Sequence, residues 1–182
     1  MKALIFLATG FEEAEFTIPY DIFKRAGIET DVVSIDENRS IRSSHQLTVV
    51  ADKTASEISD DYDIVFLPGG MPGAINLQQS WLVCQRLIKM CNENKIISAI
   101  CASPSAVLAP LGLLDGKKAT CYPGCESLSD KKDFLSDGVV ADGNIVTAKS
   151  AGWAFEFALK IVELALGKEK AEETRKAVYY LI

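Results

Sequence analysis

The chain has 182 residues, of which 48% are hydrophobic and 24% charged, and its formal net charge is −6. This length suits one domain with a sizeable core, so residues 1–182 are expected to form a single domain. The acidic balance, without any basic block, disfavours nucleic-acid binding, which requires a surface rich in lysine and arginine.

The first ten residues combine one lysine with a short apolar run, and two glutamates follow almost at once. Because no small-residue cleavage site appears, a buried strand is a better interpretation than a signal peptide. No apolar run approaches the ~20 residues that cross a bilayer. We therefore expect a cytoplasmic protein without membrane association.

Buried strands alternate with amphipathic helices along the chain, a pattern that implies right-handed crossovers and a mostly parallel sheet. The expected fold is a three-layer α/β/α sandwich. Polar residues 37–52 predict a hairpin or short extra strands, and Asp142-Gly143 is a hairpin turn signal. Strands are predicted over residues 3–7, 29–35, 62–67, 96–100, 139–140 and 145–147, and helices over 13–26, 80–92, 104–111, 153–166 and 168–179.

Three loops follow the carboxyl ends of predicted strands, where open α/β sheets bind their ligands. They contain residues 10–15, 68–70 and 101–103. Cys101 stands directly between a buried strand and a predicted helix, the arrangement of a nucleophile elbow. A helix N-terminus lowers the pKa of a thiol, so Cys101 is a candidate nucleophile; a buried structural cysteine is the alternative.

Glu15 lies in the first turn of the helix that follows the first strand, near the same edge of the sheet. It can simply favour the helix dipole, as Glu12 and Glu13 can. Beside a thiol, however, a buried carboxyl can stay protonated and donate to a thiolate. Gly69 and Gly70 are either a plain turn or, with the Ala102 amide, donors of an oxyanion hole.

The remaining cysteines and the histidine offer little further chemistry. The five cysteines are an odd number without the spacing of a disulfide scaffold, so we expect free thiols. Cys121-x3-Cys125 lacks a second pair and a nearby histidine, so no metal site is expected. His45, the single histidine, lies far from Cys101 in sequence, and we expect it to be exposed and non-catalytic within its own subunit.

These residues belong to a longer series of short motifs that covers nearly the whole chain. In chain order they are Ala3-Leu4-Ile5-Phe6-Leu7-Ala8, Gly10-x-Glu12-Glu13-x-Glu15, Ile18-Pro19-x-Asp21, Arg25-Ala26-Gly27-Ile28, Leu67-Pro68-Gly69-Gly70-x-x-Gly73-Ala74-x-Asn76-Leu77, Ala99-Ile100-Cys101-Ala102-x-Pro104, Phe155-Glu156-Phe157-Ala158-Leu159 and Gly167-Lys168-Glu169. The series resembles the ThiJ/PfpI superfamily, in the branch of the human parkinsonism-associated protein deglycase and its bacterial relatives.

The resemblance implies a flavodoxin-like fold and a homodimer. It assigns the nucleophile to Cys101, the protonated carboxyl to Glu15 and the oxyanion pocket to amides near Gly70 and Ala102. It implies conversion of methylglyoxal, glyoxal or their protein adducts to hydroxy acids without a cofactor. The partners would be a small aldehyde or a glycated protein. The alternative is an oxidative-stress sensor or chaperone in which the reactive cysteine becomes a sulfinate.

This chain departs from the branch at several positions. Tyr122, a possible pocket residue, stands where members often carry a histidine, and a phenol cannot act as a base near neutral pH. Ser150-Ala151-Gly152 replaces a Gly-Pro-Gly turn. His45 replaces an arginine near the dimer interface, so it is a candidate to approach the partner's pocket.

Two related activities are disfavoured by single positions. Protease-like members place histidine directly after the nucleophilic cysteine, where this chain has Ala102. Glutamine amidotransferases of similar architecture need a late histidine, and no histidine follows His45.

Overall fold

The computed structural model describes residues 1–131 and 133–180. Within them, seven strands form one sheet in the order β5-β2-β1-β6-β7-β9-β8, parallel except for β8, which pairs antiparallel with β9. The inner five strands follow the 2-1-3-4-5 order of flavodoxin-like folds. The strand bounds are β1 (Lys2–Leu7), β2 (Glu29–Ser34), β5 (Lys53–Thr54), β6 (Ile64–Leu67), β7 (Ile96–Ile100), β8 (Val139–Asp142) and β9 (Ile145–Ala148).

Strand β1 shows why the predicted strands are continuous apolar runs. Ala3, Ile5 and Leu7 pack into the hydrophobic cluster on one face of the sheet. Leu4 and Phe6 pack into the cluster on the other face. Successive side chains of a strand point to opposite faces, so a sheet covered on both sides needs apolar residues at every position.

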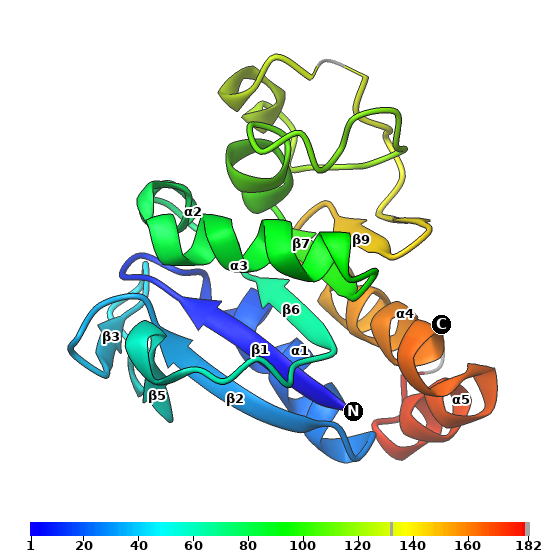
Figure 1. Ribbon diagram of the computed structural model, residues 1–182. Helices are drawn as coiled ribbons and strands as arrows, with labels where there is room; N and C mark the ends of the chain where they lie inside the picture. The colour runs from blue at the N-terminus through cyan, green and yellow to red at the C-terminus, as the bar shows by residue number, and fades with distance from the viewer. Residues whose placement is uncertain (132, 181–182) are drawn as a thin grey trace.

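Helices cover both faces of this sheet, as Figure 1 shows. Helices α1 (Glu13–Arg25) and α4 (Ala154–Leu166) supply the cluster on one face, and α5 (Lys168–Ala177) packs against α4. Helices α2 (Gly73–Gln79) and α3 (Trp81–Asn92) supply the cluster on the other face. The predicted α/β/α sandwich with a mostly parallel sheet is confirmed.

Among the shorter elements, the predicted hairpin is present, but two helical segments differ from the prediction. The polar stretch forms a hairpin of β3 (Ser40–Arg42) and β4 (Thr48–Val50), a separate antiparallel pair. The short helix α2 was not predicted. The helix expected over residues 104–111 is instead a π-helix, Pro104–Leu108, followed by turns. Pro110 lacks an amide hydrogen and Gly112 has a φ of +72°, so a longer helix is disfavoured there.

Helix length and composition bear on membrane insertion. In the part of the chain that the structure describes, no helix is both long and apolar enough to span a bilayer.

Candidate active site

The loops after β1, β6 and β7 meet at the carboxyl edge of the sheet, as predicted. The Glu12 amide, before α1, donates to the Gly69 carbonyl in the β6 loop at 3.0 Å. The Ser103 hydroxyl, after β7, donates to the Pro68 carbonyl at 2.5 Å. These hydrogen bonds connect three loops that are far apart in sequence at one edge of the sheet.

Cys101 follows β7 directly and has a φ of +65°, in the left-handed region that non-glycine residues rarely adopt. Its amide donates to the Ala148 carbonyl at 2.9 Å, and its carbonyl accepts from the Tyr122 amide at 2.8 Å. These bonds fix a conformation that costs about 1 kcal/mol. The half-buried thiol is therefore held on a sharp, strained turn, as in a nucleophile elbow.

Glu15 is placed against this thiol by the first turn of α1. The Glu12 carboxylate caps the helix by accepting from the Glu15 amide at 2.8 Å. The Glu15 side chain is 2% exposed and hydrogen-bonds the Cys101 thiol. It also accepts from the Gly69 amide at 3.0 Å and from the Ala151 amide. These bonds fix the carboxyl in one orientation facing the sulfur.

The two neighbouring glycines have different places in the site. A Cβ at Gly69 would lie 2.4 Å from the Cys101 Cβ and 2.6 Å from a Glu15 oxygen, so only glycine fits between them. The Gly69 amide donates to Glu15 at 3.0 Å. Hydrogen bonding from the amides of Gly70 and Ala102 lowers the pKa of the Cys101 thiol. Gly70 and Ala102 are therefore the amides that interact with the sulfur among the described contacts.

The thiol and the carboxyl together favour a single negative charge. Burial raises the pKa of Glu15 from 4.5 to about 7. Burial and the charge of Glu15 raise the pKa of the Cys101 thiol, while the amides of Gly70 and Ala102 oppose that shift. The expected lowering by a long helix does not apply, because the following π-helix has only five residues. Protonation of Glu15 would remove this repulsion, and the protonated carboxyl would be a donor to a thiolate.

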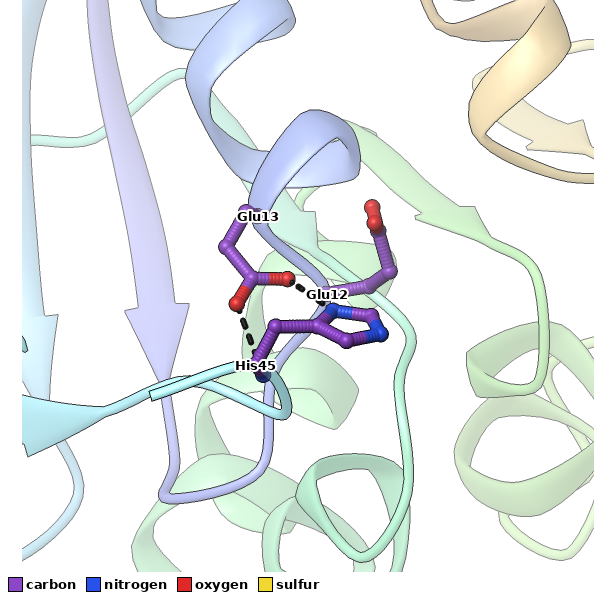
Figure 2. Close-up of side chains that lie close together, drawn as sticks. All are labelled: Glu12, Glu13 and His45. Carbon is purple, nitrogen blue, oxygen red and sulfur yellow. Dashed lines mark hydrogen bonds and ion pairs between the residues drawn. The ribbon is translucent and has the colours of Figure 1, made fainter. Parts of the chain in front are cut away.

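His45 lies on the turn of the β3–β4 hairpin, with its side chain 77% exposed. Figure 2 shows the Glu13 carboxylate bonded to both the His45 amide and its imidazole, each at 2.8 Å. The structure therefore joins the hairpin to the start of α1 through these two residues. The described contacts of His45 do not include Cys101.

Ligand atoms of Glu12, Glu13 and His45 lie within 4.8 Å of one another, a spacing that suits a metal ion. Burial opposes ionisation of Glu13, but hydrogen bonds from Ser43 and His45 lower its pKa to about 2. Glu13 in turn raises the pKa of His45. An imidazole must be neutral to bind a metal. The group is explained as an ion pair that holds the hairpin, and we assign no metal to it.

Comparison with known proteins agrees with this geometry. The sequence profile of the DJ-1/PfpI family matches residues 1–164. This chain belongs to the DJ-1/PfpI family. Protein dj-1beta of Drosophila melanogaster is 38% identical over 97% of the chain and 96% of its own length. The Parkinson disease protein 7 homolog of Danio rerio is 36% identical over 96% and 94%.

Solved structures of DJ-1 proteins share the fold in full. An oxidized DJ-1 from Toxoplasma gondii superposes with a TM-score of 0.95 at 35% identity, covering 100% of this chain and 99% of its own. Drosophila melanogaster DJ-1beta gives 0.93 at 38% identity, covering 98% and 97%. These matches confirm the flavodoxin-like fold and the resemblance stated from the motifs.

One residue of this DJ-1/PfpI site, Ala151, was not identified as a site residue from the sequence, and a second, Tyr122, contacts Cys101 through a group that the sequence did not indicate. Ala151 contributes a backbone amide to Glu15. The identity of a side chain does not indicate a contact that the backbone makes. Tyr122 was selected for its phenol, yet its described contact with Cys101 is made by its amide, and the side chain is 47% exposed. The contact of Ala151 with Glu15 and the contact of Tyr122 with Cys101 are both made by segments that are distant from their partners in sequence.

Proposed function

We propose that the protein converts 2-oxoaldehydes such as methylglyoxal and glyoxal, or their adducts on proteins, to hydroxy acids without a cofactor. One observation carries the proposal: the buried Glu15 carboxyl, with its pKa raised to about 7, hydrogen-bonds the Cys101 thiol. A carboxyl that titrates near neutral pH can give and take a proton within one catalytic cycle.

In the first step, the Cys101 thiolate attacks the aldehyde carbon of methylglyoxal and forms a hemithioacetal. Negative charge develops on the aldehyde oxygen and is neutralised by a proton from Glu15. The amides of Gly70 and Ala102, which point to the sulfur, support the proposal because they stabilise the thiolate before attack.

In the second step, the Glu15 carboxylate removes the hydrogen of the former aldehyde carbon as a proton and returns it to the adjacent carbon. The hydroxyl proton of the first carbon passes to the oxygen of the second. The first carbon is oxidised, the second is reduced, and the product is a thioester of Cys101. Water then hydrolyses the thioester, releasing lactate and the thiol. The sum is methylglyoxal plus water giving lactate, so no external oxidant or reductant is needed.

Substitution of the two residues tests this proposal. Cys101→Ala and Glu15→Gln should each lower lactate formation from methylglyoxal by at least ~100-fold, because general acid–base catalysis alone contributes that much. Lactate is followed by proton NMR with purified protein. Cys84→Ser, on the far helix α3, is the matched control and should retain full activity.

The outcomes separate the residue roles. Activity retained in Cys101→Ala would exclude covalent catalysis through this thiol. Activity retained in Glu15→Gln alone would remove the proton shuttle from Glu15. A glycated peptide, supplied in place of free methylglyoxal, decides whether adducts are substrates as well.

A second candidate function is an oxidative-stress sensor or chaperone with little turnover. The same two amides and a protonated Glu15 could hold a sulfinate on Cys101. The likeness to an oxidized Toxoplasma gondii DJ-1 supports this alternative. In excess peroxide, Cys101 should gain two oxygen atoms by mass spectrometry, and the absence of that gain would count against sensing through a sulfinate.

The oligomeric state stays a prediction. The family resemblance implies a homodimer, and an approach of His45 to a partner's pocket requires one. Light scattering of the purified protein distinguishes a 19.8 kDa monomer from a dimer.

A further inference from the structure

Backbone hydrogen bonds connect the turn at residues 122–125 to Cys101. The Tyr122 amide donates to the Cys101 carbonyl at 2.8 Å, and the Cys125 amide donates to the Tyr122 carbonyl at 2.9 Å. Two consecutive backbone hydrogen bonds therefore link the turn of the nucleophile to Cys125, although 24 positions separate them in sequence. Gly124, with a φ of +94°, supplies the left-handed residue that this turn requires.

Burial and charge also place the two thiols in one neighbourhood. Both cysteines are half-buried and pack against the same apolar cluster. Burial raises the pKa of the Cys125 thiol, and the charges of Glu126 and Glu15 raise it further. Glu15 is the carboxyl that hydrogen-bonds the Cys101 thiol. Cys125 thus lies within electrostatic reach of the reactive pair.

The turn that leads to Cys125 is more exposed to solvent than Cys101. Tyr122, Pro123 and Gly124 are exposed, so few buried contacts hold them. A disulfide needs Cα atoms about 4.4–6.8 Å apart. Any adjustment needed to bring the two cysteines together would fall on this exposed turn. Cys101, by contrast, is fixed on both sides by backbone hydrogen bonds to Ala148 and Tyr122.

We propose that Cys125 is a resolving cysteine for Cys101 and gives the protein a peroxide-reducing dithiol site. Hydrogen peroxide oxidises the Cys101 thiolate to a sulfenic acid, and one water leaves after protonation. The Cys125 thiol then attacks the sulfenyl sulfur, a sulfur–sulfur bond forms, and a second water leaves. In sum, two thiols and one peroxide give one disulfide and two waters.

This chemistry goes beyond the proposed oxoaldehyde reaction. The two reactions share one requirement, a reactive Cys101 thiol. The disulfide competes with further oxidation of the sulfenic acid to a sulfinate, which has no simple route back. A thiol reductant reverses the disulfide. Limiting peroxide should therefore give the disulfide, and excess peroxide should give the sulfinate. The reason is that the sulfenic acid needs a second peroxide to become a sulfinate but none to form the disulfide.

The test is intact mass after treatment of the reduced, full-length protein with one equivalent of hydrogen peroxide. Wild type should lose two hydrogen atoms, and peptide mapping should show Cys101 joined to Cys125. Cys125→Ser should instead gain oxygen atoms on Cys101, while Cys84→Ser should form the same disulfide as wild type. Dithiothreitol should restore the starting mass of wild type. Circular dichroism confirms that each variant is folded.

Two results would overturn the inference. One is a gain of oxygen atoms on Cys101 in wild type, equal to that in Cys125→Ser. The other is a disulfide from Cys101 to the buried Cys121 in wild type. Lactate formation is measured separately on the same wild-type preparation. A disulfide without lactate would contradict only the proposed function, and lactate without a disulfide would contradict only this inference.

Discussion

At the scale of single residues, the candidate site pairs the Cys101 thiol with the buried Glu15 carboxyl. Sequence position made both residues candidates, because each lies after a strand that ends at the same sheet edge, and the family resemblance gave them their expected roles. It was not enough to predict the electrostatics. The thiol's pKa is raised by burial and by Glu15, a consequence of side-chain contacts that only the folded chain defines.

The buried carboxyl should make the stability of the protein depend on pH. Burial raises the pKa of Glu15 from 4.5 to about 7, so the folded state binds more protons than the unfolded state between these values. The contribution of Glu15 to the free energy of unfolding should be highest below pH 4.5 and should fall as pH rises to 7, by about 3 kcal/mol. Glu15→Gln stays neutral and should lack this decrease.

Urea denaturation of both proteins at pH 5 and pH 8 measures the effect. Glu37→Gln replaces an exposed carboxyl and should follow wild type at both values. Equal pH dependence in wild type and Glu15→Gln would show that the Glu15 pKa is not raised in the folded protein.

At the scale of elements, the hairpin β3–β4 is fastened to α1 by Glu13. Its carboxylate accepts from the backbone amide and the imidazole of His45 and from the hydroxyl of Ser43. The Gly10 amide also donates to the Arg42 carbonyl at 2.8 Å, at the end of β3. The hairpin therefore borders the loop that leads into Glu15.

Removing the charge of Glu13 should be visible at the single histidine. Glu13 raises the pKa of His45 by a hydrogen bond and by its charge. In Glu13→Gln the His45 pKa should fall toward the ordinary value of 6.5, as followed by NMR titration of the imidazole. Asp21→Asn, which breaks an ion pair with Arg25 on the same helix, is the control and should leave His45 unchanged. An unchanged His45 in Glu13→Gln would contradict this contact.

The secondary-structure elements that could be predicted are those with a clear sequence signal. The central strands follow from continuous apolar runs, and the hairpin turn from Asp142-Gly143. The helix expected over residues 104–111 was wrong in type and length, because side-chain pattern alone does not separate a π-helix from an α-helix. Helix α2 was missed because seven residues give too short a pattern. The contact of Ala151 with Glu15 depends on tertiary packing of a loop.

At the scale of the whole molecule, the site is supported by the hydrophobic cluster on one face of the sheet. Phe66 on β6 packs against Phe23 of α1, with ring centroids 6.3 Å apart, and against Phe157 of α4 at 5.4 Å. Two residues further along, Pro68 begins the loop that holds Cys101 and Glu15. Loss of packing at Phe66 should therefore disturb Cys101 and Glu15 together.

If residues 1–182 form one domain, Phe66→Ala should lower the free energy of unfolding by about 3–5 kcal/mol in a single transition. Urea unfolding is followed by circular dichroism and by the fluorescence of Trp81 on α3 and Trp153 beside the Ala151 turn. Leu164→Ala, at a side chain 44% exposed on α4, should change stability far less. Midpoints that coincide for both probes support a single domain. Separate midpoints would show that the site and the far helix unfold independently, and the single-domain prediction would then be wrong.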